Sequence, residues 1–130
     1  MKKEKNWMIW IRPGNNLCMV NEDYYGKGLG IMEAARNLIG CEYIEAVHPR
    51  KEFGFLKGTL LLIDEEGKYM DDARHNRIAT MCAEIDPMDH IVGGAVLVEE
   101  IPEDFDFIKD KDRAEALCGQ IMTELLDWDL

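Results

Sequence analysis

The sequence predicts a single α+β domain, in which about three helices pack on a small, mostly antiparallel or mixed β-sheet. The chain has 130 residues, a length that suits one domain with its own core. β-prone runs and helical stripes follow one another in the order strands, helix, strand, strand, helix, strand, helix, which is typical of the α+β class. No repeat and no linker divides the chain, so residues 1–130 are expected to form one domain.

The N-terminal half opens with a predicted hairpin. WMIWI at 7–11 and LCMV at 17–20 are β-prone and flank the turn residues RPG. A helix closed by Gly40 is predicted next, from apolar and flanking positions spaced by three and four: Leu29, Met32, Ala35, Arg36 and Ile39. YIEAV at 43–47 alternates as a strand does, and residues 48–58 are expected to form a loop.

A central strand and a second helix are predicted after this loop. GTLLLID at 58–64 is continuously apolar, as in a strand covered on both faces, and EEGK supplies its turn. Asp71 or Asp72 is a suitable N-cap for the helix that follows. Its apolar stripe consists of Ile78, Met81, Cys82 and Ile85, and Pro87 is expected to stop it.

The last two elements give the strongest patterns. HIVGGAVLVEEI at 90–101 predicts a strand, in which Gly93 and Gly94 permit a bulge or a close backbone approach. Asp110 or Asp112 is expected to cap the final helix. Its stripe comprises Ala114, Leu117, Cys118, Ile121, Met122, Leu125 and Leu126.

Composition places the chain among soluble globular proteins. Apolar residues make up 47% and charged residues 32%, and no apolar run is long enough to cross a bilayer. MKKEKNW at the start is basic but has no cleavage-type small residues, so a cytoplasmic location in a bacterial host is expected. The four cysteines never form a CxxC pair, which favours reduced and mostly buried thiols.

Charge is the most unusual property of the composition. The chain has 26 acidic against 15 basic side chains, a net charge of −11. Residues 99–130 hold eleven acids against Lys109, Lys111 and Arg113. Such a surface repels phosphate backbones and disfavours direct nucleic-acid binding. Two interpretations remain: a solvated acidic surface that maintains solubility, or an imitation of nucleic acid that occupies the basic groove of a partner.

Several segments together resemble a known family. GCEYIEAVHP, LLIDEEGKYMDDARHNRIA and DHIVGGAVLVEEI resemble, in order and spacing, the domain of unknown function DUF3846. The matching positions are Gly40, Ile44, Glu45, Glu66, Gly67, Lys68, Asn76, Arg77, Ala79, Asp89, Ile91, Gly93 and Val96. Where the family has an apolar residue followed by Asn, this chain has Ile63 and Asp64, and it has Gly94 where the family often has Thr.

The resemblance covers a family-like core at 7–101, with the acidic C-terminal helix at 102–130 outside it. It implies a genetic setting in phages, plasmids and other mobile elements. It implies no catalytic residues, because none are assigned to the family.

One cationic cluster is the candidate ligand site: Arg74, His75, Asn76 and Arg77. Guanidinium groups at a helix N-terminus are suited to a nucleotide phosphate. Alternatively, the arginines pair with nearby acids and Asn76 binds the backbone of the EEGK turn. The acids in question are Asp64, Glu65, Glu66, Asp71 and Asp72.

The acidic final helix and a strand edge are the candidate partner-binding surface. On the helix, the residues expected to contact a partner are Glu115, Glu124, Asp127 and Trp128. His48, His75 and His90 stand at no metal-binding spacing, and no nucleophile, phosphate-loop or dinucleotide motif is present. No catalytic residue, metal or cofactor is therefore predicted.

These observations favour a non-enzymatic accessory protein of a phage or mobile element, which binds and inhibits a host protein, for instance in anti-defence. One alternative is a binder that sequesters a small signalling nucleotide. Another is a domain with a structural role only. Self-association into a homo-oligomer is compatible with each of these hypotheses, and a membrane partner is not expected.

Overall fold

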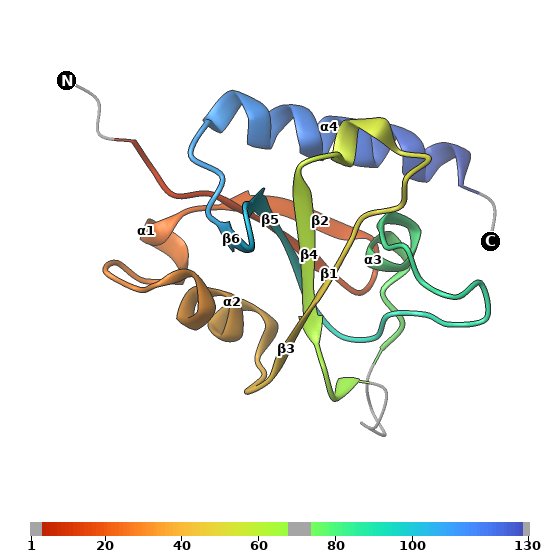
Figure 1. Ribbon diagram of the computed structural model, residues 1–130, viewed down its shortest axis with the longest axis horizontal. Helices are drawn as coiled ribbons and strands as arrows, with labels where there is room; N and C mark the ends of the chain where they lie inside the picture. The colour runs from red at the N-terminus through yellow and green to blue at the C-terminus, as the bar shows by residue number, and fades with distance from the viewer. Residues whose placement is uncertain (1–3, 68–73, 129–130) are drawn as a thin grey trace.

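The protein is an α+β domain built around one antiparallel sheet, as predicted. The computed structural model describes residues 4–67 and 74–128. Its six-stranded sheet has the order β2-β1-β5-β4-β3, and β6 pairs with β5 (Figure 1). The strands are β1 (Met8–Arg12), β2 (Asn16–Val20), β3 (Ile44–Val47), β4 (Thr59–Asp64), β5 (Ala95–Ile101) and β6 (Asp104–Asp106). The helices are α1 (Glu22–Tyr25), α2 (Ile31–Ile39), η1 (Gly54–Leu56), α3 (Arg77–Cys82) and α4 (Lys111–Asp127).

The predicted N-terminal hairpin is present. β1 and β2 pair antiparallel from Met8 opposite Val20 to Arg12 opposite Asn16. The turn between them needs left-handed backbone, which Gly14 and Asn15 adopt at φ values of 86° and 61°. Glycine and asparagine are the residues that take this conformation at least cost. The second strand of the hairpin forms one edge of the sheet.

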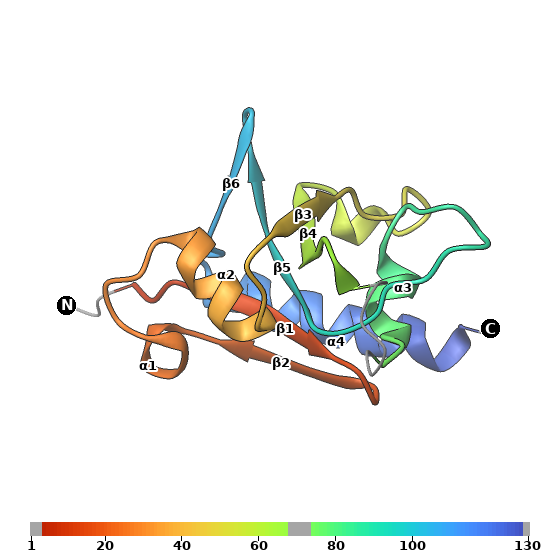
Figure 2. The same cartoon turned by 90° about the horizontal axis from the view of Figure 1, so that it is seen from below.

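Strands β4 and β5 form the centre of the sheet and are covered on both faces. Leu61 and Leu97 point into one apolar cluster, while Leu62 and Val96 point into the other. This double burial explains why both segments are continuously apolar rather than alternating. The first cluster lies under α3 and α4, and the second lies under α1 and α2. Figure 1 shows α4 on one side of the sheet and α1 and α2 on the other, and in Figure 2, seen from below, α2 lies in front of the strands and α4 behind them.

Helix α4 follows the prediction at its start but buries a narrower stripe. Asp110 caps it by accepting a hydrogen bond from the amide of Asp112. The buried residues are Ala114, Leu117, Ile121 and Leu125. The inclusion of Met122 and Leu126 in the core stripe was wrong, because these side chains are 39% and 86% exposed. Each follows a buried residue by one position, about 100° further round the helix, so it turns toward solvent.

Helix α2 also forms where expected and ends at Gly40, which is left-handed at φ 79°. Its core side is shifted relative to the prediction. Ala34, Ala35 and Leu38 are the buried residues, whereas Arg36 is exposed. Of the residues predicted to form the core side of this helix, only Ala35 is among the fully buried ones. The shift brings two small residues against the sheet, which lets the helix approach closely.

The start of α3 corrects the prediction for the cationic segment. Asp71 and Asp72, expected as caps, lie outside the described residues, as does Lys68. The structure begins the helix at Arg77 and caps it with Asn76, whose side-chain oxygen accepts from the amide of Ala79 at 3.0 Å. The helix also ends at Cys82, five residues before Pro87. Arg74 and His75 therefore precede the helix.

Asn76 is fully buried. Its amide nitrogen donates to the carbonyl oxygens of Ile11 at 3.1 Å and Gly93 at 2.8 Å. The amide thus joins β1, the approach to β5 and the first turn of α3. A buried amide is tolerated only when its polar atoms are satisfied in this way.

Two further features complete the fold. The predicted loop at 48–58 contains the short helix η1, whose Leu56 is fully buried. Arg113 of α4 makes a two-pronged ion pair with Glu99 of β5, which ties the helix to the sheet. Within residues 4–67 and 74–128, no helix has the length and apolar character that a membrane crossing requires.

Replacing Asn76 with alanine should lower the free energy of unfolding by about 2–4 kcal/mol. The variant loses a helix cap and the two hydrogen bonds that Asn76 donates to the carbonyl groups of Ile11 and Gly93. Urea denaturation followed by circular dichroism measures the change. Asn37→Ala is the matched control, because Asn37 lies exposed on α2 and should change stability by less than about 0.5 kcal/mol. Equal stability of the two variants would show that the Asn76 network contributes nothing.

Candidate partner-binding surface

The four cationic-segment residues do not converge on one site. Arg74 and His75 are exposed, and His75 forms a bridge with Val92 through its backbone. The His75 ring lies edge-on to that of His90, with centroids 5.1 Å apart. Asn76 is occupied by main-chain groups of Ile11, Gly93 and Ala79 rather than by the EEGK turn. The segment therefore lacks the convergent set of donors that a phosphate site needs.

Arg77 is held by the end of α4. Its guanidinium donates to the carbonyl oxygen of Trp128 at 2.5 Å. The Trp128 ring packs edge-on against Phe53, with centroids 6.0 Å apart, and lies 5.0 Å from the guanidinium carbon of Arg50. Its indole nitrogen is buried and has no hydrogen-bond partner among the described residues. Trp128 thus anchors α4 to the body of the protein.

The predicted acidic contact residues remain at the surface of α4. Glu115 and Asp127 are exposed, and Glu124 is half-buried. Glu115 lies 3.9 Å from Lys111 one turn earlier, a weak exposed ion pair. The structure thus places three of the four predicted residues where a partner can reach them, and it places Trp128 largely inward.

Leu126 adds an apolar element to this surface. It is 86% exposed, and Met122 lies one turn before it at 39%. When each residue advances 100°, Glu115 lies about 20° from Met122 around the helix, on the same side, whereas Asp127 lies about 140° from Met122, on the other flank beyond Leu126. The outer surface of α4 thus combines exposed apolar side chains with acids.

The second exposed feature is the outer edge of β3. Within the described residues, β3 pairs with β4 on one side and with no strand on the other. The amide of Glu65 donates to the carbonyl of Tyr43 at 3.0 Å, so the backbone groups of Tyr43, and of every second residue after it, point toward β4. Because an antiparallel ladder alternates, the backbone groups of Ile44 and Ala46 point away from β4. Their N–H and C=O groups therefore lie at the free edge.

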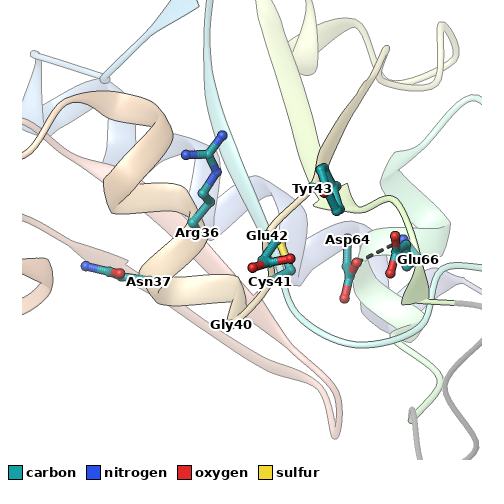
Figure 3. Close-up of a pocket in the computed structure, with 8 residues that line it drawn as sticks. All are labelled: Arg36, Asn37, Gly40, Cys41, Glu42, Tyr43, Asp64 and Glu66. Atoms are coloured by element: carbon teal, nitrogen blue, oxygen red, sulfur yellow. Dashed lines mark hydrogen bonds between the residues drawn. The ribbon is translucent and has the colours of Figure 1, made fainter.

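An acid-lined hollow opens beside this edge on the α2 side of the sheet. It encloses about 920 Å³. Figure 3 shows Glu42, Asp64 and Glu66 around it, with Arg36 extending from α2 away from Asp64 and Glu66. The Asp64 carboxylate accepts a hydrogen bond from the amide of Glu66 at 2.9 Å, so the turn after β4 holds both residues in place. The remaining lining residues are Asn37, Gly40, Cys41 and Tyr43.

Acids also lie on the other side of β3. Glu45 is exposed, and with Glu65 and Asp89 it lines a smaller hollow floored by Val47 and Ile63. Glu45 stands directly opposite Ile63 in the ladder. The edge is therefore flanked by carboxylates on both faces of the sheet. Among the residues that line the larger hollow, Arg36 is the basic one.

The thiol of Cys41 responds to this negative potential. Burial first, and the carboxylate of Asp64 second, raise the pKa of Cys41 to about 11, with Arg36 acting in the opposite direction. The thiol is therefore protonated near neutral pH and is a poor nucleophile. All four cysteines are free: Cys82 is buried, and Cys18, Cys41 and Cys118 are half-buried rather than mostly buried as predicted. Burial raises the pKa of Cys82 to about 12.

Other hollows on the described surface mix charges. One of about 830 Å³ lies between the end of β3, where Ala46 and Val47 line it, and the 48–58 loop. Its charged lining residues are His48, Arg50, Lys51 and Lys57 together with Glu45, Glu84 and Glu100. Another of about 520 Å³ lies beside His75, His90 and Trp128. Within residues 4–67 and 74–128, no three His, Cys, Asp or Glu side chains are grouped as metal ligands would be.

Fold and site together define a small antiparallel α+β domain with an unpaired, acid-flanked strand edge. The chain belongs to the family described as a domain of unknown function, DUF3846, whose model matches residues 7–121. The match extends past residue 101 and includes α4 as far as Ile121. No curated protein and no solved structure matches the chain.

Sequence patterns identified the acids of α4 but not the strand edge as a defined site. A strand edge was expected to contribute to the contact surface, yet no residue could be assigned to it. Which strand is outermost depends on the order β2-β1-β5-β4-β3, which connects segments far apart in the chain. The available signal was the charge of Glu42 and Glu45 around a short strand, since exposed edges commonly carry charged side chains.

The alkylation rate of Cys41 should report the potential in the acid-lined hollow. Because the Asp64 carboxylate raises the pKa of Cys41, Asp64→Asn should lower this pKa and raise the thiolate fraction at fixed pH. A shift of half a unit would speed alkylation about threefold at pH 8. Peptide mass spectrometry after timed iodoacetamide treatment measures the rate. Arg36→Gln is the paired variant and should slow the reaction; the opposite order of rates would contradict the electrostatics.

Proposed function

We propose that this protein is a non-enzymatic accessory protein that acts by binding a partner protein through its acidic surface. The observation that carries the proposal is the outer surface of α4, where exposed Leu126 and Met122 lie on one side of the helix with Glu115, and exposed Asp127 follows Leu126 on the other flank. Exposed apolar groups bordered by polar ones are typical of protein interfaces. The net charge of −11 indicates a partner with a basic contact surface.

The family resemblance supports a setting for this activity. A domain carried by phages or other mobile elements encounters host proteins in the bacterial cytoplasm, and inhibition of a host defence protein is the form of the proposal that such a setting favours. A partner that normally grips nucleic acid has the basic groove that an acidic surface can occupy. Binding of this kind requires no catalytic group.

Nucleotide capture by the 74–77 segment is less well supported. Asn76 uses its amide on main-chain groups, and Arg77 donates to the carbonyl of Trp128. Binding a phosphate there would break contacts that hold α3 and α4 in place. Among the described residues, the acidic side chains predicted to bind a partner, Glu115, Glu124 and Asp127, make one ion pair, the exposed one between Glu115 and Lys111.

Charge reversal on α4 tests the proposal. Glu115→Lys, Glu124→Lys and Asp127→Lys combined should reduce capture of the host partner at least tenfold, because attraction to a basic surface becomes repulsion. Affinity purification from host extract, with quantitative mass spectrometry, measures the loss. Wild-type capture should also weaken as salt rises from about 0.05 to 0.5 M.

A control variant separates the α4 surface from net charge. Glu33→Lys, Glu103→Lys and Asp104→Lys combined change the total charge by the same amount, on α2 and on the β5–β6 hairpin. This variant should retain most of the capture. Equal loss in both variants would show that no contact is specific to α4, and full retention in the α4 variant would overturn the proposal.

A further inference from the structure

We infer that the outer edge of β3 binds an extended, basic peptide segment of a partner protein by strand addition. The inference rests on the proposed function, because it names the chemistry of the partner and a second surface that contacts it. It starts from the unpaired backbone groups of Ile44 and Ala46. Unpaired strand edges are templates for another strand, since main-chain hydrogen bonds supply affinity.

The chain itself shows that this edge accepts a strand. Immediately after β3, residues 48–50 pair antiparallel with residues 82–84 on the side away from β4. The amide of Glu84 donates to the carbonyl of His48 at 2.9 Å, and the amide of Arg50 donates to the carbonyl of Cys82 at 2.7 Å. An added peptide over Ile44 and Ala46 would continue the line of this segment.

Within residues 4–67 and 74–128, the chain leaves the edge after Glu84 and no segment pairs with the outer side of β3. Ile85 packs against the cluster under α3 and α4, and the bridge of Pro49 with Ala83 is the last pairing along this line among the described residues. Ala46 and Glu45 are exposed. The edge is thus closed at one end by residues 82–84 and open along β3.

Charge determines which peptide fits. Successive side chains of an added strand point to opposite faces of the sheet. On the α2 face they meet Glu42, Asp64 and Glu66, and on the opposite face they meet Glu45 and Glu65. Lysine or arginine at positions of either parity therefore finds a carboxylate toward the start of β3, whereas Arg50, Lys51 and Lys57 lie toward its end, in the hollow that Ala46 lines. The occupant indicated by the structure is a segment with basic residues on both faces of its strand.

The same charges disfavour a second copy of this chain as the occupant. Two β3 edges paired with each other would bring Glu45 of one copy near the acids of the other, together with both sets of Glu42 and Asp64 side chains. Like charges on opposed strands destabilise the pair. A partner of opposite charge meets no such penalty.

The direct test uses a synthetic peptide, acetyl-Val-Lys-Arg-Val-Lys-Arg-Val-amide, and the unmodified protein. Peptide binding should protect the amides of Ile44 and Ala46 from hydrogen exchange, with a dissociation constant below about 1 mM. An isomer N-methylated at the alternate residues that face the edge should bind at least tenfold more weakly, although its charge is identical. The isomer methylated at the other alternate residues should bind normally. A control peptide in which glutamate replaces every lysine and arginine should not bind.

Ala46→Pro provides the protein-side test. The backbone amide of Ala46 points away from β4, so proline at this position removes a donor from the free edge and leaves the bonds to β4 intact. Proline is tolerated at such edge positions. Ala46→Pro should raise the dissociation constant of the peptide at least tenfold. Ala46→Val, which retains the N–H donor, should change it by less than about twofold. Circular dichroism and urea denaturation establish that each variant folds. If Ala46→Pro does not fold, the two methylated peptides decide the question alone.

Three outcomes would overturn the inference. One is the absence of amide protection at about 1 mM peptide. Another is peptide binding with protection on α4 and none at Ile44 and Ala46. The third is protection of Ile44 and Ala46 without peptide in a protein that elutes as a dimer. The triple α4 lysine variant should still bind the peptide, so loss of host-partner capture with peptide binding intact separates a failure of the proposed function from a failure of this inference.

Discussion

The buried amide of Asn76 is the contact on which the arrangement of the functional surface depends. It holds the first turn of α3 to β1 and to the chain entering β5. At the other end of α3, Arg50 donates to the carbonyl oxygens of Met81 at 2.9 Å and Thr80 at 3.3 Å. The two contacts fix α3 at both ends, and the position of α3 fixes residues 82–84 beside residues 48–50. The limit of the free β3 edge follows from this chain of contacts.

The sequence predicted the elements well where burial alone determines the pattern. β4 and β5 are apolar throughout because helices cover both faces of the sheet, and α4 repeats its buried residues at three and four. The prediction was weaker where contacts between residues far apart in the chain determine the position of a side chain or a strand. Asn76 was interpreted as a ligand residue or as a partner of the EEGK turn, because its actual partners Ile11 and Gly93 are 65 and 17 residues away. The cap of α3 was assigned to Asp71 or Asp72, whereas Asn76 fills that role. The free edge of β3 depends on strand order, which local patterns do not contain.

The contribution of an acidic side chain to stability in this protein depends on how far it is buried. Glu99 is buried enough to make a two-pronged pair with Arg113 and so contributes to joining α4 to the sheet. Glu115 and Asp127 lie in solvent, where ion pairing contributes little to stability. Their cost to stability through mutual repulsion is also small for the same reason, because water and salt screen them. An excess of acids can thus persist at a surface for reasons other than folding.

The α4 surface and the β3 edge are well separated on the molecule, because α4 covers the sheet while β3 is its outermost strand on the far side of β4 from β5 (Figure 1). A partner that contacts both must therefore present two basic elements, one of them an extended segment. Two weak contacts joined in one partner reinforce each other, because the first raises the local concentration of the second. A short edge and an exposed helix, each insufficient alone, would then give strong binding to a partner that carries both. Selectivity follows from the same geometry, since a basic protein without an extended segment engages α4 only.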